Sequence, residues 1–268
     1  MESTIARPRP IQATTSSRFA GAGNVFQKEL REWFRTRRFL VTAVLTSLML
    51  GAVPVVVFLH QGGLHDGRVD SGYRGVMNAW VALTLTLGAY LIVALTMTII
   101  VKEEDGGTAQ WIFTKPVSRS GYVLAKYAAN VVAVVLGAVV IPSLVLLALT
   151  GATQSGGIQS WTAVVQTMGF ASLHAAIVVG LVVGLSGLFR SSAPIAGIAI
   201  GMGFVPLFFN DLVPQQLTNL FPVEIGNIAS QAVRGDHLAP WQPVVCGIAL
   251  LAVSLAFACY RIERRQLQ

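Results

Sequence analysis

Residues 79–101 read AWVALTLTLGAYLIVALTMTIIV, and the chain continues with Lys102, Glu103, Glu104 and Asp105. The quoted stretch contains no Asp, Glu, Lys or Arg, and about 20 predominantly apolar residues suffice for a helix to cross a bilayer. A barrel strand facing lipid would show alternation, whereas a helix pairs its backbone groups within the segment. The stretch therefore predicts a transmembrane helix that ends at a cluster of charges.

The same pattern recurs along the chain. Five further charge-free apolar stretches occupy residues 39–59, 127–150, 164–189, 193–209 and 244–260. The fifth and sixth stretches in chain order are the short ones, and 193–209 could instead be broken or re-entrant. We predict an all-α integral membrane protein with six transmembrane helices, and the alternative is five spans plus a re-entrant hairpin.

Composition supports this class. Charged residues make up 12% of the 268 residues, about half of the roughly 25% found in soluble domains. Hydrophobic residues make up 54%, and the two cysteines are too few for a disulfide scaffold. These values exclude an ordinary water-soluble globule.

The net charge of +7 has a topological meaning. With six spans and both ends inside, sixteen of the nineteen Lys and Arg residues lie on the cytoplasmic side, including those of the C-terminal segment 261–268. Positive charge accumulates on cytoplasmic loops. We therefore expect a multi-pass protein of a cytoplasmic membrane, of prokaryotic type, and we do not interpret the charge as a nucleic-acid-binding face.

The segment before the first span divides in two. Residues 1–23 are rich in Ser, Thr, Pro and Arg and are expected to be disordered. Residues 24–38 predict an amphipathic helix in the cytoplasmic interface. Its apolar stripe comprises Phe26, Leu30, Trp33 and Phe34, and its flanking cations include Arg31 and Arg35. The alternative is a simple basic anchor that sets topology.

The cytoplasmic loop 102–121 is the most distinctive segment outside the predicted spans. It contains the acids Glu103, Glu104 and Asp105, the pair Gly106 and Gly107, and then Thr108, Trp111 and Arg119. The glycines break the helix, Thr108 can cap a short helix over residues 108–114, and Pro116 ends it. By composition alone, the loop could also be only a well-formed turn.

The external loop 210–243 carries a second amphipathic stripe, formed by Ile225, Ile228, Ala229 and Ala232. We expect a short helix there, packed on the outer face near the fifth and sixth spans. No P-loop motif, catalytic constellation or convincing metal-ligand spacing is present in the sequence. The chain is therefore not expected to be an enzyme by itself, and it would draw energy for active transport from elsewhere.

The loop resembles one in the permease subunits of ABC transporters of the type-2 exporter class. The matching elements are Glu103-Glu104-Asp105, Gly107-Thr108, Trp111-Ile112-Phe113 and Thr114-Lys115-Pro116-Val117-Ser118-Arg119. The last element looks most like the subgroup often labelled multi-copper-enzyme maturation permeases, from which we transfer no copper. The predicted layout of interfacial helix, six spans and external helix is also similar to that family.

The resemblance implies a complex with a second permease chain, identical or homologous, and two P-loop ATP-binding subunits that hold ATP and Mg²⁺. It assigns ATPase coupling to residues 103–108, Trp111 and Arg119, and substrate movement to alternating access. By the same resemblance, Thr84, Thr96, Gly197 and Gly201 would lie near the pathway or dimer interface. The alternatives are a secondary transporter or channel that is not coupled to ATP, or a membrane-embedded assembly factor.

Overall fold

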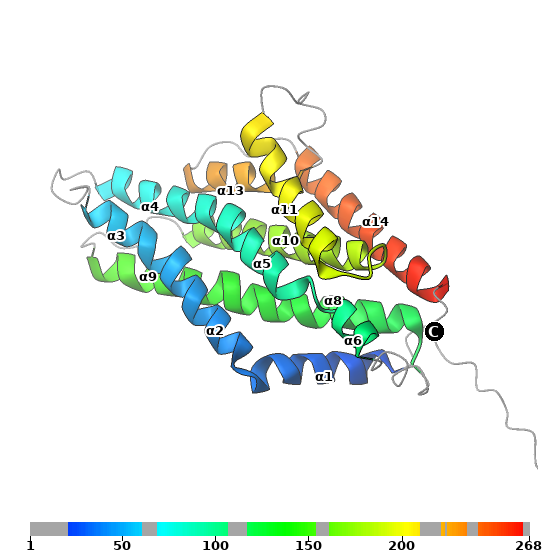
Figure 1. Ribbon diagram of the computed structural model, residues 1–268. Helices are drawn as coiled ribbons and strands as arrows, with labels where there is room; N and C mark the ends of the chain where they lie inside the picture. Colours follow the sequence, from blue (N-terminus) through cyan, green and yellow to red (C-terminus); the bar gives the residue numbers. More distant parts are fainter. Residues whose placement is uncertain are drawn as a thin grey trace, which may run out of the picture.

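The computed structural model describes residues 21–60, 69–106, 117–153, 161–209, 221–222, 224–234 and 241–264. Every regular element in these ranges is a helix, which confirms the all-α prediction (Figure 1). The first helix begins inside the segment expected to be disordered, because Ala22 and Gly23 are already helical. Gly21 precedes it with a φ of 73°, a left-handed conformation that glycine adopts without a side-chain clash.

The helical elements follow in chain order, with α for α-helices and η for π-helical turns. They are α1 Ala22–Arg35, α2 Arg37–Thr46, η1 Ser47–Ala52, α3 Val53–His60, α4 Val69–Leu83, η2 Thr84–Gly88, α5 Ala89–Thr96, α6 Val101–Asp105, α8 Arg119–Val134, η3 Val135–Val140, α9 Ile141–Thr153, α10 Trp161–Ser186, α11 Ser192–Phe209, α13 Glu224–Arg234 and α14 Gln242–Arg264.

Each of the first three predicted spans contains one π-helical turn between two α-helical parts. Such turns disturb the regular backbone ladder, and polar side chains can then satisfy the affected backbone groups inside a membrane. Thr46, at the end of α2, illustrates this. Its hydroxyl lies 2.8 Å from the carbonyl oxygen of Gly137 in η3, so a polar contact joins the first and third spans.

Five helices in the described ranges are long and apolar enough to cross a membrane: Arg37–Val56, Gly75–Glu103, Arg119–Thr150, Trp161–Ser186 and Gln242–Arg264. They correspond to the first four predicted spans and the sixth, and they make the chain a multi-pass α-helical protein. The fifth predicted span corresponds to α11, and the part of α11 whose side chains are described, Ser192–Gly203, is apolar but shorter than these five helices. The count of six therefore stays a prediction.

Helix α10 lies at the centre of the bundle and packs against α5, α8, α11, α13 and α14. Its contact with α14 is close because Gly184 faces Ser254, where an added Cβ would lie 2.9 Å from the serine Cβ. Small residues let membrane helices approach in this way. Gly197 and Gly201 lie four residues apart in α11, but an added Cβ at either would meet nothing within 4 Å.

The short external helix is present as α13, and the four residues of its predicted stripe are buried. Its position differs from the expected one, because it packs mainly on α10 and α4, with a smaller contact to α14. His174 in α10 fixes the approach to α13, since its Nδ1 lies 3.0 Å from the carbonyl oxygen of Pro222. A carbonyl can only accept, so Nδ1 carries the hydrogen.

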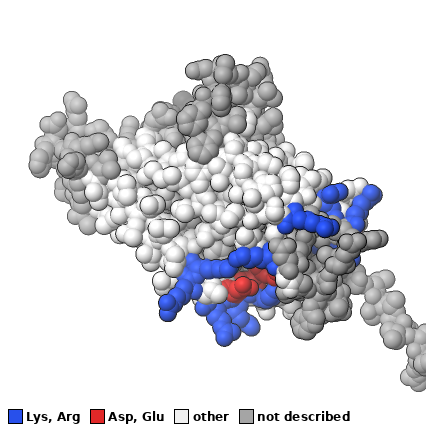
Figure 2. All heavy atoms as spheres, viewed as in Figure 1, with Lys and Arg blue, Asp and Glu red and all other residues white. Residues whose placement is uncertain are grey.

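The described Lys and Arg side chains gather at one end of the bundle (Figure 2). Helices α1 and α6, the start of α8 and the end of α14 lie at this end (Figure 1). The opposite end carries the end of α3, the start of α4 and the end of α9 (Figure 1). The three cations expected on the outside, Arg68, Arg74 and Arg234, have side chains outside the described part of the chain, so the cytoplasmic assignment of this end stays a prediction.

Candidate coupling site at the charged end of the bundle

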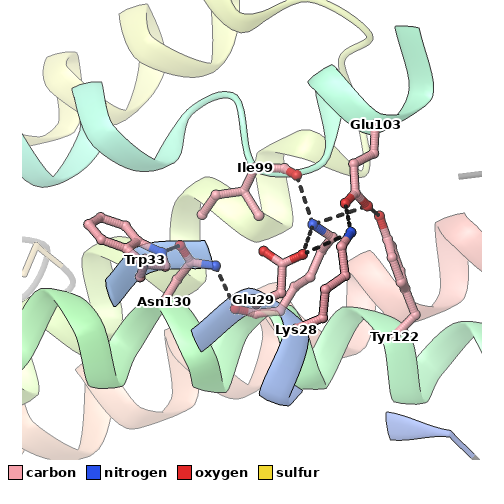
Figure 3. A network of polar contacts seen from close by, with 8 residues as sticks. Lys28, Glu29, Trp33, Ile99, Glu103, Tyr122 and Asn130 are labelled. Atoms are coloured by element: carbon pink, nitrogen blue, oxygen red, sulfur yellow. Dashed lines mark hydrogen bonds and ion pairs between the residues drawn. The ribbon is translucent and has the colours of Figure 1, made fainter. Parts of the chain in front are cut away.

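A polar cluster joins α1, the junction of α5 with α6, and α8 (Figure 3). The indole Nε1 of Trp33 donates to Asn130 Oδ1 at 2.8 Å, and Lys126 Nζ donates to Glu29 Oε1 at 2.9 Å. Both pairs join residues 97 positions apart. A constant offset over a four-residue step means that α1 and α8 lie side by side and run in the same direction.

Lys126 is the centre of the cluster and only 1% exposed. Its ammonium lies 2.9 Å from Glu29 Oε1, 3.1 Å from Glu103 Oε2 and 3.2 Å from the carbonyl oxygen of Ile99. Two of the three N–H groups of the ammonium donate to Glu29 and to the Ile99 carbonyl, and Glu103 adds an ion pair. A charge buried in this way is tolerated only when it is paired and hydrogen-bonded.

The carbonyl of Ile99 can accept from Lys126 because the helix of the second span is interrupted. Residues 97–100 form turns between α5 and α6. In a continuous α-helix the N–H of Glu103 would donate to Ile99, but here it donates to Ile100 at 3.1 Å. The interruption therefore leaves the Ile99 carbonyl oxygen free to accept the hydrogen bond from Lys126.

Glu103 connects α6 to both neighbouring helices. Its Oε1 accepts from Lys28 of α1 at 2.8 Å, and its Oε2 accepts from the hydroxyl of Tyr122 in α8. Burial alone would lower the pKa of Lys28, but the hydrogen bond and charge of Glu103, with the charges of Glu29 and Glu32, raise it above its ordinary value. Lys28 therefore stays charged, and the cluster holds two cations against two carboxylates.

Arg119, at the start of α8, makes a different contact. Its Nη1 donates to the carbonyl oxygen of Glu263 at 2.8 Å and lies 3.5 Å from that of Ile262. These carbonyls belong to the last turn of α14, where no intrahelical donor remains. Arg119 thus ties the beginning of the third span to the end of the last helix.

The structure places the predicted coupling residues in three groups. Glu103 lies in the cluster and Arg119 caps α14. The backbones of Glu104 and Asp105 belong to α6, and the N–H of Gly106 then donates to the Lys102 carbonyl at 3.0 Å. Gly107, Thr108, Trp111 and the predicted helix over residues 108–114 lie outside the described residues.

The predicted stripe of α1 is shifted relative to its buried face. The buried residues are Val25, Glu29 and Trp33, while Phe26 and Leu30 are half-buried and Phe34 is 49% exposed. Arg31 and Arg35 are exposed, as expected. The placement of this helix in the membrane interface stays a prediction. The structure adds that its most buried face contacts α8.

Most residues of the cluster were not assigned to the site from the sequence: Lys28, Glu29, Tyr122, Lys126 and Asn130. A signal exists in retrospect. Glu29 lies midway between Val25 and Trp33, and Lys126 lies midway between Tyr122 and Asn130. Two polar positions with matching four-residue spacing could have indicated two helices in register.

The residues assigned to the pathway or dimer interface do not share a surface. Thr84 is 4% exposed and Thr96 is fully buried within the subunit, where the Thr96 hydroxyl donates to the Ile92 carbonyl at 2.6 Å. Gly197 and Gly201 have open space beside them. Of the four, only the two glycines of α11 are therefore placed where another chain could approach closely.

In the described part of the chain, several helices of membrane-spanning length and an ion-pair cluster near their charged end indicate a multi-pass membrane protein. The family described as ABC-2 family transporter protein matches residues 23–267, and the chain belongs to this family. It is accordingly the transmembrane component of an ABC transporter. No curated protein matches the chain at a significant level.

Proposed function

We propose that the chain is the permease subunit of an ATP-driven exporter and works by alternating access. Two permease chains, identical or homologous, form the pathway, and two separate ATP-binding subunits hold ATP and Mg²⁺. The Thr114–Arg119 sequence favours the subgroup labelled multi-copper-enzyme maturation permeases. The energy of ATP enters through the loop between the second and third spans.

One observation carries this proposal: both flanks of the loop are attached to each other and to α1. Glu103 precedes the loop, Tyr122 and Lys126 follow it, and the three side chains meet at hydrogen-bond distance. Lys28 and Glu29 add α1 to the same cluster. A push on the loop would therefore reach the second span, the third span and α1 together, as a coupling element requires.

The first experiment identifies the partner. The tagged chain is purified from its native membranes, and co-purifying proteins are identified by mass spectrometry. We expect a stand-alone P-loop ATPase in an amount comparable to that of the chain. Its absence, or transport by the chain alone in vesicles without ATP, would favour a secondary transporter or channel instead.

The second experiment locates the coupling. Glu104→Ala and the double variant Gly107→Ala/Thr108→Ala should weaken association with the ATPase or uncouple ATP hydrolysis from transport. Gly169→Ala in α10 is the matched control, because an added Cβ meets nothing within 4 Å there. Loop variants that assemble and hydrolyse ATP like the control would show that the loop is not the coupling element.

A further inference from the structure

A cavity of about 100 Å³ opens beside the ion-pair cluster, between α1, the start of α2, the α5–α6 junction and α8. Figure 2 shows acidic side chains in a hollow between basic ones at this end of the molecule. The inner lining includes the buried residues Glu29, Trp33, Lys126 and Asn130. The outer lining includes Glu32, Arg38 and Lys102, which are exposed.

The charged residues of the inner lining form ion pairs, whereas those of the outer lining form none with the described residues. The inner acids Glu29 and Glu103 are neutralised by Lys126 and Lys28. Among the described residues, none forms an ion pair with Glu32, Arg38 or Lys102. Within the described part of the chain, the mouth of the cavity therefore presents two cations and one carboxylate that have no ion-pair partner.

The mouth lies where the apolar spans begin and end. Arg38 directly precedes the first predicted span and Lys102 directly follows the second, so both side chains are placed at the level of the cytoplasmic lipid headgroups. Leu95 and Ile99 form an apolar part of the lining. Next to Arg38, Leu40 is 65% exposed, which leaves apolar surface beside the mouth.

We propose that this cavity binds the headgroup of a phospholipid that carries a primary amine, such as phosphatidylethanolamine. The phosphate lies between Arg38 and Lys102, because paired cations are a common way to bind a phosphodiester. The ammonium donates to Glu32, and the acyl chains follow the apolar surface of the first two spans. A zwitterion of this kind matches all three unpaired charges, whereas a choline headgroup has no N–H to donate to the carboxylate.

The experiment uses the full chain in nanodiscs made of equal parts phosphatidylethanolamine, phosphatidylcholine and phosphatidylglycerol, and native mass spectrometry counts the lipids that stay bound. We expect about tenfold enrichment of the ethanolamine lipid, the ratio given by about 1.4 kcal/mol. Arg38→Gln/Lys102→Gln should abolish retention of this lipid. Glu32→Gln should keep lipid binding but lose the preference for ethanolamine.

Arg31→Gln is the matched control, because Arg31 is an exposed cation of α1 that is not part of the cavity lining. All substituted side chains are exposed, and unchanged thermal unfolding will verify that the variants fold. Equal retention of the choline lipid, equal retention of phosphatidylglycerol, or wild-type retention by Arg38→Gln/Lys102→Gln would overturn the proposal. So would equal binding of soluble phosphoethanolamine, since the site would then not recognise a lipid. No ATP-binding subunit is present, so the result is independent of the proposed function.

Discussion

Replacing Lys126 by methionine removes a buried charge while keeping a side chain of similar length. The substitution leaves the Glu29 carboxylate with Lys28 as its remaining ion-pair partner, at 3.7 Å. Glu103 keeps Lys28 at 2.8 Å and the hydroxyl of Tyr122. The cost is therefore concentrated on Glu29.

Removing one partner of a buried ion pair costs about 3–5 kcal/mol. We expect the lower end for Lys126→Met, about 3 kcal/mol, because the Glu29 side chain is 10% exposed. For a chain of this size, that corresponds to a Tm lowered by roughly 6–12 °C. The assay is thermal unfolding of the purified chain in detergent, followed by circular dichroism.

A second substitution distinguishes two causes of the lower stability: the unpaired Glu29 carboxylate and the lost packing of the lysine side chain. Lys126→Met/Glu29→Gln should regain about 1–2 kcal/mol, because the neutral amide costs less to bury than the carboxylate. Arg31→Gln, on the exposed side of α1, should leave Tm unchanged. The reasoning is refuted if Lys126→Met unfolds at the wild-type temperature, or if the double variant is no more stable than Lys126→Met.

Three further outcomes test the packing. Gly184→Ala should destabilise the chain by about 1–3 kcal/mol, because its Cβ would lie 3.1 Å from the Ser254 carbonyl oxygen. Gly197→Ala should unfold at the wild-type temperature. Equal unfolding temperatures of the two variants would contradict the close contact between α10 and α14. Arg119→Gln should speed hydrogen exchange in the last turn of α14, whereas exchange at the wild-type rate would show that the arginine does not hold this turn. Trp33→Phe should cost about 1–3 kcal/mol in thermal unfolding, because it leaves a buried amide oxygen without its donor; a wild-type Tm would show that this hydrogen bond contributes little.

The helices of the bundle were predictable because a helix that crosses a lipid bilayer needs a long apolar run without charged residues. The residues at which these helices begin and end were less predictable. The third span was expected from residue 127, yet α8 begins at Arg119, where the Ser118 side chain accepts from the N–H of Gly121 at 3.1 Å. Such a cap starts a helix before the apolar run does. The polar first turns of α8 are stable because they pack on α1.

The cluster could not be read from the sequence for a different reason. Its partners lie 97 residues apart, and a lysine at a membrane boundary is fully explained by topology alone. The stripe of α1 was interpreted from its aromatic residues, and Glu29, on the buried face, was given no role. Amphipathicity likewise predicted which face of α13 is buried, but it carries no information on which helices cover that face.

The acceptors of Lys126 belong to three different elements: Glu29 to α1, the Ile99 carbonyl to the α5–α6 junction, and Glu103 to α6. Moving any one element away from α8 would break one of these contacts and leave a buried polar group without a partner. Because each such loss is costly, the low-energy motions are those that move the elements as one body. The interruption at residues 97–100 then marks where this body joins the membrane part of the second span. We therefore expect a bend there, rather than separation of α1 from α8, when the loop is displaced.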